Sequence, residues 1–133
     1  MKRWLLDTSA LLTLRDDEAG AQQVADILAA TLGQRAECHA CFMTLMELTY
    51  RVWKDEGESA ARLAREQCLS LPLQWVHESP ALLWEAAQLM ALYRLSLADA
   101  WIAAAAQLVG ATLVHKDPEF TPLKMAQVAL PFK

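Results

Sequence analysis

The sequence predicts an α/β fold, with a mostly parallel central sheet of about five strands and helices on both faces. Short apolar segments alternate along the chain with longer segments of helical periodicity, the pattern expected of a parallel sheet covered on both sides. The chain has 133 residues, of which 55% are hydrophobic and 21% charged, as in a globular protein with one core. We therefore expect a single domain over residues 1–133.

The first half of the chain is predicted to contain two strands and four helices. Residues 18–32 have apolar side chains at helical spacing and end at Gly33, a residue common at helix ends. Gly57 separates two further helical segments. In chain order we expect a strand at 3–6, a helix from 8 to 14, a helix at 18–32, a strand at 37–43, a helix at 47–56 and a helix at 58–70.

The second half is predicted to contain three strands and two helices. Ser79 followed by Pro80 is typical of a helix start, since serine caps the helix and proline suits its first turn. The second helix is apolar nearly all round and ends at Gly110. In chain order we expect a strand at 74–77, a helix from 80 to 93, a helix at 97–108, a strand at 112–115 and a strand at 126–130.

Composition limits the classes of function. A net charge of −4 argues against a protein that coats nucleic acid by neutralising phosphates, although an enzyme with a local acidic site remains compatible. Three cysteines cannot all pair with one another, so we expect reduced thiols in a cytoplasmic protein. The start of the chain lacks the pattern of a signal peptide, and the most apolar segment, 100–114, is shorter than the ~20 residues of a membrane span.

Four acidic residues stand in apolar surroundings. Asp7 and Asp117 follow predicted strands, and the carboxyl ends of parallel strands line the ligand crevice in such folds. Glu47 and Asp99 lie in predicted helices, and the helical neighbours of Asp99 include no basic partner. Carboxylates rarely enter apolar surroundings unless they are paired, hydrogen-bonded or bound to a metal. If the fold gathers the four, they form a site for Mg²⁺ or Mn²⁺ of the kind that acts on phosphodiesters.

Most of these acids also have an ordinary explanation. Asp7 could cap the helix that follows it, and Asp117 before Pro118 also looks like a helix start. Glu47 stands four residues before Arg51, a spacing that favours a surface ion pair. For Asp99 a partner must come from elsewhere in the fold, so a functional role is favoured there.

Four segments together resemble the signature segments of PIN-domain ribonucleases. They are LDTSAL at 6–11, Glu47 early in a helix, LSLADA at 95–100 and LVHKDPEF at 113–120. Each is weak alone, but the four occur in the family's order at suitable spacing. Chain length and element order are similar to those of VapC-type toxins of type II toxin–antitoxin systems, and the resemblance spans nearly the whole chain.

The resemblance implies an Mg²⁺-dependent endoribonuclease that cleaves RNA phosphodiester bonds with a metal-activated water, and in which Mn²⁺ can substitute. It also implies a homodimer and a cognate antitoxin that blocks the site. The implied catalytic residues are Asp7, Glu47, Asp99 and Asp117. The implied metal ligands are Asp7, Asp99 and Asp117, with Glu47 completing the first or second shell.

Three further residues are candidate auxiliary groups. Thr8 and Ser9 could orient water or a metal ligand, although helix capping is their minimum role. At position 115 the family often has threonine or serine, whereas this chain has His115. A histidine there could contact a phosphate or lie on the rim of the site, and it removes none of the four acids.

Two other classes of function remain open. A catalytically silent PIN-like module could act only through a protein or RNA partner, but the presence of all four acids counts against it. A receiver-like phosphoacceptor domain also uses clustered acids and Mg²⁺, yet it needs adjacent acids after the first strand, where this chain has Asp7 followed by Thr8.

Other motifs have simpler interpretations. Cys38 and Cys41 have C-x-x-C spacing, but no second ligand pair follows, and on a strand the two thiols would face opposite sides. Basic residues could flank the site for RNA or simply form a solvated helix face; they are Arg51, Lys54, Arg62 and Arg65. Four tryptophans are more typical of a core or an interface than of a base-stacking platform; they are Trp53, Trp75, Trp84 and Trp101.

Overall fold

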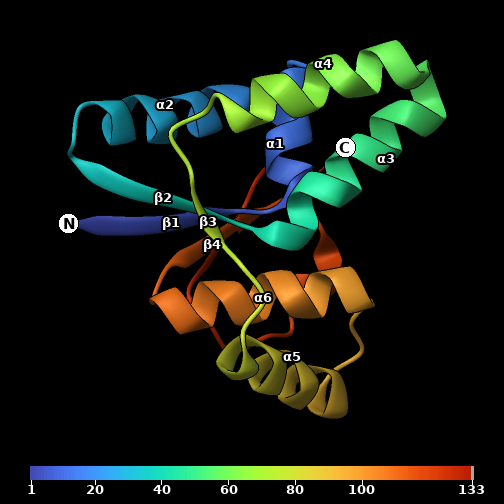
Figure 1. The fold of residues 1–133 in the computed structure, drawn as a ribbon. Coiled ribbons are helices and arrows are strands. Elements are labelled where there is room, and N and C mark those ends of the chain that lie inside the picture. The colour runs from blue at the N-terminus through green and yellow to red at the C-terminus, as the bar shows by residue number, and fades with distance from the viewer. Residues whose placement is uncertain (133) are drawn as a thin grey trace.

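The computed structural model describes residues 1–132 and contains one parallel sheet of five strands in the order β3-β2-β1-β4-β5. All four neighbouring pairs of strands are parallel, and helices cover both faces of the sheet (Figure 1). The predicted α/β fold is confirmed. The strands are β1 (Lys2–Leu6), β2 (Ala36–Cys41), β3 (Gln74–Val76), β4 (Thr112–His115) and β5 (Gln127–Ala129).

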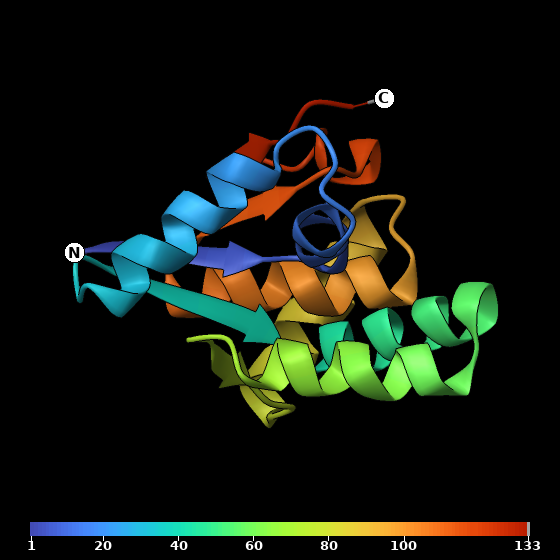
Figure 2. The same cartoon turned by 90° about the horizontal axis from the view of Figure 1, so that it is seen from above.

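The helices form two unequal layers. In Figure 1 the first four helices lie above the sheet, α6 lies directly below it, and α5 packs on the far side of α6. Figure 2 shows α2 crossing over the strands and the α3–α4 hairpin extending beyond the sheet. The helices are α1 (Thr8–Arg15), α2 (Ala21–Leu32), α3 (Phe42–Glu56), α4 (Glu58–Leu69), α5 (Pro80–Leu92) and α6 (Leu97–Val109), with a short 3₁₀ turn, η1 (Pro118–Phe120).

Successive strand residues supply two separate cores. Leu5 and Leu113 face α5 and α6, whereas Leu6 and Val114 face the layer of α1 to α4; all four are fully buried. The alternation follows from the two-residue period of a strand. Because both faces are covered, the end of β1 and the middle of β4 place apolar side chains on both sides of the sheet, as buried parallel strands usually do.

The small side chains of α6 let it lie close to the sheet. Ile102 and Ala103 to Ala106 are all fully buried, in the core that α6 shares with Leu5 and Leu113 of the sheet. In consequence the first turn of α6, which carries Asp99, lies beside the carboxyl ends of the strands. Among the described residues, none of the helices has both the length and the apolarity needed to cross a membrane.

Three predicted boundaries differ from the structure by two or more residues. Strand β2 ends at Cys41 rather than at residue 43, and α3 begins at Phe42, five residues earlier than predicted. Cys41 has an extended backbone and no side-chain cap, so the start of α3 lacks the usual sequence signal. Helix α2 begins at Ala21 rather than at residue 18, because Asp17 and Gly20 take positive φ angles of 51° and 101° in the preceding turn.

The C-x-x-C cysteines lie in different cores. Cys38 packs with the layer of α1 to α4, and Cys41 packs with α5 and α6. Both thiols are free, and burial raises the pKa of Cys38 to about 12 and that of Cys41 to about 11. They therefore behave as inert core thiols, which agrees with the interpretation that they do not share a metal.

Candidate active site

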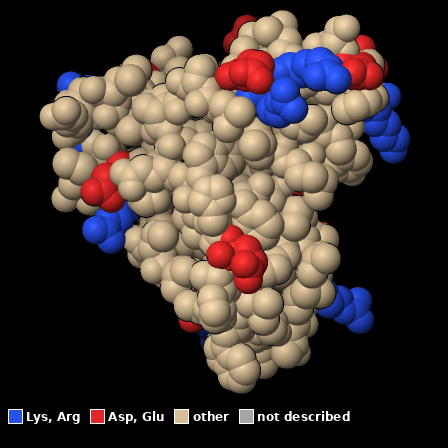
Figure 3. Space-filling view, in the orientation of Figure 1, with Lys and Arg blue, Asp and Glu red and all other residues tan. Residues whose placement is uncertain are grey.

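Side chains from distant parts of the sequence surround one small polar pocket at the carboxyl ends of β1 and β4. The pocket has a volume of about 170 Å³. In Figure 3 the outline of the molecule is indented at the right, between the part formed by α3 and α4 and the part formed by α5 and α6. The residues that line the pocket are Asp7, Thr8, Ser9, Glu47, Arg51, Asp99, Lys116 and Asp117.

Asp7 comes directly after β1 and is held at both ends. Its N–H donates to the Val114 carbonyl at 3.1 Å, and its Oδ1 accepts from the Ala10 N–H at 2.8 Å as the cap of α1. The capping interpretation was therefore right, yet the side chain still lines the pocket and is only 2% exposed. Burial raises the pKa of Asp7 to about 7, against the lowering effect of its hydrogen bonds from Ala10 and Ser9.

Ser9 connects Asp7 to the segment that follows β4. Its Oγ lies 2.8 Å from each oxygen of Asp7 and accepts a hydrogen bond from the Lys116 N–H, also at 2.8 Å. Because the hydroxyl accepts from a backbone N–H, its own proton is directed at the carboxylate. Thr8 instead bonds Thr44 of α3 through its hydroxyl at 3.3 Å, so it joins two helices at the base of the pocket.

Asp99 is the third residue of α6 and the most perturbed acid of the pocket. Its N–H is capped by the Ser96 Oγ at 3.1 Å, and its side chain is buried. The pKa of Asp99 is raised to about 8, chiefly by burial and then by a hydrogen bond with Asp117 and by the charges of Asp117, Glu119 and Asp7. The partner that the sequence required is thus a set of other acids rather than a base.

Asp117 follows β4 and caps the 3₁₀ turn. Its Oδ1 accepts from the Glu119 N–H at 2.9 Å. Asp99, Asp117 and Glu119 each offer a carboxylate oxygen within 4.8 Å of the others, which is close enough to share a metal ion. Glu119 was missed as a site residue by sequence reasoning, because its place beside Pro118 indicated only a helix start.

The two basic residues at the pocket have acidic partners of their own. Arg51 lies 3.6 Å from Glu47, as the i,i+4 spacing predicted, and the Glu47 side chain is 13% exposed. The Lys116 ammonium is buried 3.7 Å from Glu18, in the turn between α1 and α2. Neither of these two ion pairs includes Asp7 or Asp99.

The expected place of His115 requires correction. The ring is fully buried beneath the site rather than on its rim, and packs against Phe120 with ring centroids 5.0 Å apart. Its Nδ1 accepts from the Asp117 N–H at 3.1 Å, so Nε2 carries the proton and donates to the Gln127 Oε1 at 2.8 Å. Gln127 in turn donates to the carbonyls of Phe120 and Leu123. His115 supports the backbone of Asp117 and has no ring nitrogen left for a phosphate.

Basic residues of α4 are paired on its surface. Arg62 bonds Glu58 at 2.7 Å, and Arg65 lies 3.4 Å from Glu66. Figure 3 shows charges of both signs gathered along the upper edge of the molecule, over α4. This arrangement fits a solvated helix face better than a basic flank for RNA.

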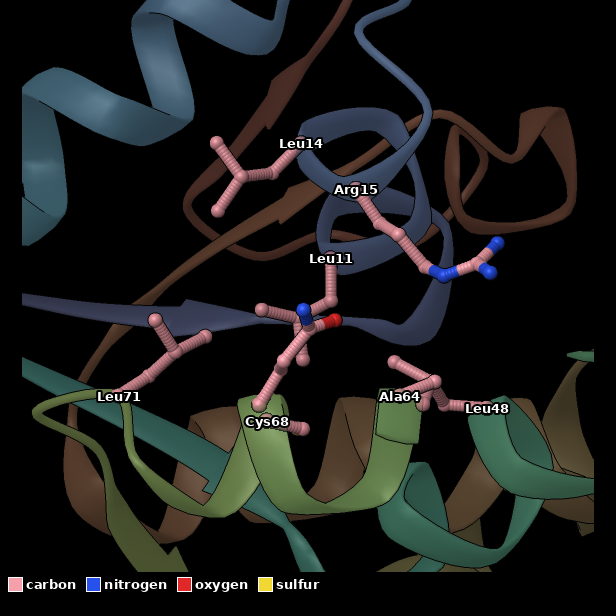
Figure 4. A pocket seen from close by; sticks show the side chains of 8 residues that line it. Leu11, Leu14, Arg15, Leu48, Ala64, Cys68 and Leu71 are labelled. Carbon is pink, nitrogen blue, oxygen red and sulfur yellow. The ribbon is translucent and has the colours of Figure 1, made fainter. Parts of the chain in front are cut away.

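A second, apolar pocket lies between α1, α3 and α4. It has a volume of about 250 Å³. Figure 4 shows side chains from these three helices converging on it, with Arg15 pointing outward at one side. The residues that line it are Leu11, Leu14, Arg15, Leu48, Ala64, Gln67, Cys68 and Leu71. Leu48 follows Glu47 on α3, so the two pockets are neighbours.

The polar pocket suits a hard divalent cation. All of its charged candidate ligands are carboxylates, and oxygen ligands favour Mg²⁺ or Mn²⁺ over softer metals. The raised pKa values of Asp7 and Asp99 mean that their ionised forms lack sufficient stabilisation from the protein alone. A bound cation would supply that stabilisation, so the residues present fit such an ion.

The protein is thus an α/β domain with a parallel sheet and an acid-lined pocket at the carboxyl ends of its strands. The sequence model of the PIN domain matches residues 4–124, and the chain belongs to this family. No curated protein sequence matches the chain. The family predicted from four short segments is thereby confirmed.

Solved structures share the fold over nearly their whole length. A chain of VapBC2 from Rickettsia felis bound to a promoter DNA fragment is 18% identical, with 97% of this chain and 99% of that chain covered and a TM-score of 0.78. DNA-bound VapBC from Salmonella typhimurium is 19% identical, with 97% of this chain and 98% of that chain covered and a TM-score of 0.75. VapC20 of Mycobacterium tuberculosis, described as a toxin that cleaves the sarcin–ricin loop, is 18% identical. The comparison covers 96% of this chain and 98% of that chain, with a TM-score of 0.72.

Proposed function

We propose that the protein is an Mg²⁺-dependent endoribonuclease and the toxin of a toxin–antitoxin pair. The observation that carries the proposal is the burial of Asp7 and Asp99 among other acids, at the ligand-binding edge of a PIN-family sheet. Buried carboxylates so close together are unfavourable in their ionised form unless a cation is bound. The whole chain would act as one nuclease domain in the cytoplasm, where its cysteines stay reduced.

The acids have distinct proposed roles. Asp7, Asp99 and Asp117 would hold the cation, and Glu47 would complete the shell from α3. Since Mg²⁺ usually keeps several waters, one or two direct carboxylate bonds per ion are expected. The chemistry supplied by the bound ion is polarisation of a phosphoryl oxygen and a lowered pKa for an attacking water. Ser9 fixes the orientation of the Asp7 carboxylate through its 2.8 Å contacts.

Protons oppose the binding of the cation. With pKa values of about 7 and 8, Asp7 and Asp99 retain protons near neutral pH when no ion is present. Binding would release these protons, so affinity for Mg²⁺ should increase with pH up to about 8. The same protons account for the stability of the buried carboxyls without metal.

An antitoxin is the proposed protein partner. The similar chains come from structures described as VapBC complexes, and this chain offers an apolar pocket beside the polar one (Figure 4). An antitoxin segment with apolar side chains would fill the apolar pocket and place a neighbouring basic group over the acids, since opposite charges attract across an interface. Binding in this way would exclude RNA from the site.

A homodimer is proposed from the exposed side chains of α3. Met46, Tyr50 and Trp53 are 57%, 51% and 50% exposed and are spaced by four and three residues, so they form one apolar stripe on the helix. Sedimentation of the isolated protein should give the mass of two chains, and Tyr50→Arg should reduce it to one. A monomeric wild-type protein would contradict this part of the proposal.

The test of the proposed activity is cleavage of a mixed RNA pool by the antitoxin-free protein, with Mg²⁺, with Mn²⁺ and with EDTA. Cutting should require a divalent ion and should be lost in Asp99→Asn. If the folded wild-type protein binds the ion but cuts no RNA, including ribosomal RNA, the alternative of a catalytically silent binding module replaces the nuclease.

A further inference from the structure

Glu119 has no role in the proposed acid quartet, although it lies beside it. Its carboxylate belongs to the cluster with Asp99 and Asp117, all within 4.8 Å of one another. Yet its Oε1 already accepts a hydrogen bond from the Ser96 N–H, at the start of α6. Glu119 is therefore committed to a backbone partner on the same helix that carries Asp99.

The start of α6 shows what this bond replaces. Ser96 and Asp99 have the S-x-x-D spacing of a capping box. In a complete box the serine hydroxyl accepts from the N–H of the third helical residue, and the acid at that residue accepts from the N–H of the serine. The first bond is present here, from Asp99 N–H to Ser96 Oγ at 3.1 Å. In place of the second, the Ser96 N–H donates to Glu119.

We propose that Glu119 is a positioning residue for the cation site: it takes over the capping bond at Ser96 and so leaves the Asp99 carboxylate free to face the pocket. Without Glu119, the capping-box spacing offers the Asp99 carboxylate as the acceptor for the Ser96 N–H. Asp99 would then turn toward its own helix end and away from Asp117. The inference rests on the proposed function, because it concerns the same acids.

A second consequence concerns the joint between two segments. Glu119 belongs to η1, directly after β4, whereas Ser96 precedes α6. Their bond holds the segment that carries Asp117 against the helix that carries Asp99. Glu119 thus fixes the relative position of two proposed ligands, acting through a backbone N–H rather than through direct contact with the ion.

Two uncharged variants separate the hydrogen bond from the charge. Glu119→Gln keeps an oxygen acceptor, whereas Glu119→Met has similar length and no such acceptor; both lose the negative charge. Glu78→Gln, at an exposed acid before α5, is the control for a change in net charge. Because both variants are uncharged and similar in length, a difference between them reports the polar amide with its acceptor and not the charge.

The first measurement is hydrogen exchange of the Ser96 amide in the metal-free protein. Exchange should be slow in the wild type, Glu119→Gln and Glu78→Gln. The Gln and Met variants are also made with Asp99→Ala, which removes the substitute acceptor; in that background exchange should be faster with Met than with Gln, because the amide has lost both acceptors. Equal exchange of the Gln and Met variants in the Asp99→Ala background would overturn the inference. Thermal unfolding of each variant confirms that the comparison is made on folded protein.

The second measurement is Mn²⁺ affinity by electron paramagnetic resonance. The Met variant should bind about two- to tenfold more weakly than the Gln variant, the range expected for one hydrogen bond. Equal affinities of these two variants, with Mn²⁺ bound by the wild type, would overturn the inference alone. No Mn²⁺ binding by the folded wild type would overturn the proposed function, and the inference with it.

Discussion

Carboxylates at the two ends of the sheet have opposite electrostatic surroundings. At the amino ends of the strands, Glu37 lies 3.0 Å from the Arg3 guanidinium, and that arginine also donates to the Val109 carbonyl. At the carboxyl ends, Asp7 and Asp99 are buried, and the charges that act on them are those of other acids. An acid paired with a cation of the protein needs no ligand, whereas an acid that forms no such pair within residues 1–132 needs a proton or a metal. The comparison distinguishes structural acids from the candidate site.

The largest expected effect comes from replacing one acid at each end of the sheet by its uncharged amide. Asp99→Asn should reduce RNA cleavage by more than about 100-fold, since it removes a ligand while keeping side-chain size. Glu37→Gln should leave the rate within about twofold, because an exposed ion pair contributes little. Initial rates at saturating Mg²⁺ test this, and comparable losses in the two variants would contradict the distinction between the two ends.

The stability that the protein gains on binding Mg²⁺ should depend on the acids at the carboxyl ends of the strands and not on Glu37 at the amino ends. At an Mg²⁺ concentration of 100 times Kd, the wild type should gain about 2.7 kcal/mol, or about 10 °C in Tm. Asp99→Asn should show little of this gain, whereas Glu37→Gln should retain it. Calorimetry with and without Mg²⁺ measures the effect, and a full gain in Asp99→Asn would place the ion elsewhere.

The pH dependence of stability should also differ between the ends. For Asp99 the folded pKa of about 8 lies above the ordinary value of 3.8. Below both values the carboxyl is protonated in both states; between them only the folded state keeps its proton, so stability falls as pH increases from about 4 to about 8. In metal-free protein at pH 8, Asp99→Asn should therefore raise Tm by about 5 °C, and Glu37→Gln should not.

Unfolding measured at pH 5 and pH 8 gives the control, because most of the advantage of Asp99→Asn should disappear at the lower pH. A variant equally stabilised at both values would mean that the change acts through packing rather than through ionisation. An unchanged Tm at pH 8 would mean that Asp99 ionises without cost.

The smallest expected effect is that of Ser9→Ala. The change removes the hydroxyl that joins Asp7 to the Lys116 N–H, so the carboxylate loses an orienting donor but keeps the Ala10 bond. Cleavage should fall by about tenfold with little change in cation affinity, in the range known for groups that orient metal ligands. Steady-state rates across Mg²⁺ concentrations separate the two effects, and a wild-type rate would remove Ser9 from the proposed site.

Local patterns in the sequence were sufficient for the fold class, and they singled out the four acids that the structure brings to one pocket. The alternation of strand-like and helical periods predicted the parallel sheet, because period depends on neighbours within a few residues. Asp7 was noticeable because an apolar strand ends at it, and Asp99 because no basic residue shares its helix face. Those signals depend on residues close together in the chain, so they can be recognised in a single sequence.

Only the tertiary structure decided which acids are neighbours and which residues support them. His115 was expected on the rim, yet it lies buried beneath Asp117 with its tautomer fixed by Gln127. Glu119 gave no local signal of its bond to Ser96, 23 residues earlier. Contacts of this kind depend on how the crossovers bring separate strand ends to one edge of the sheet, and no pattern within a few residues encodes that arrangement.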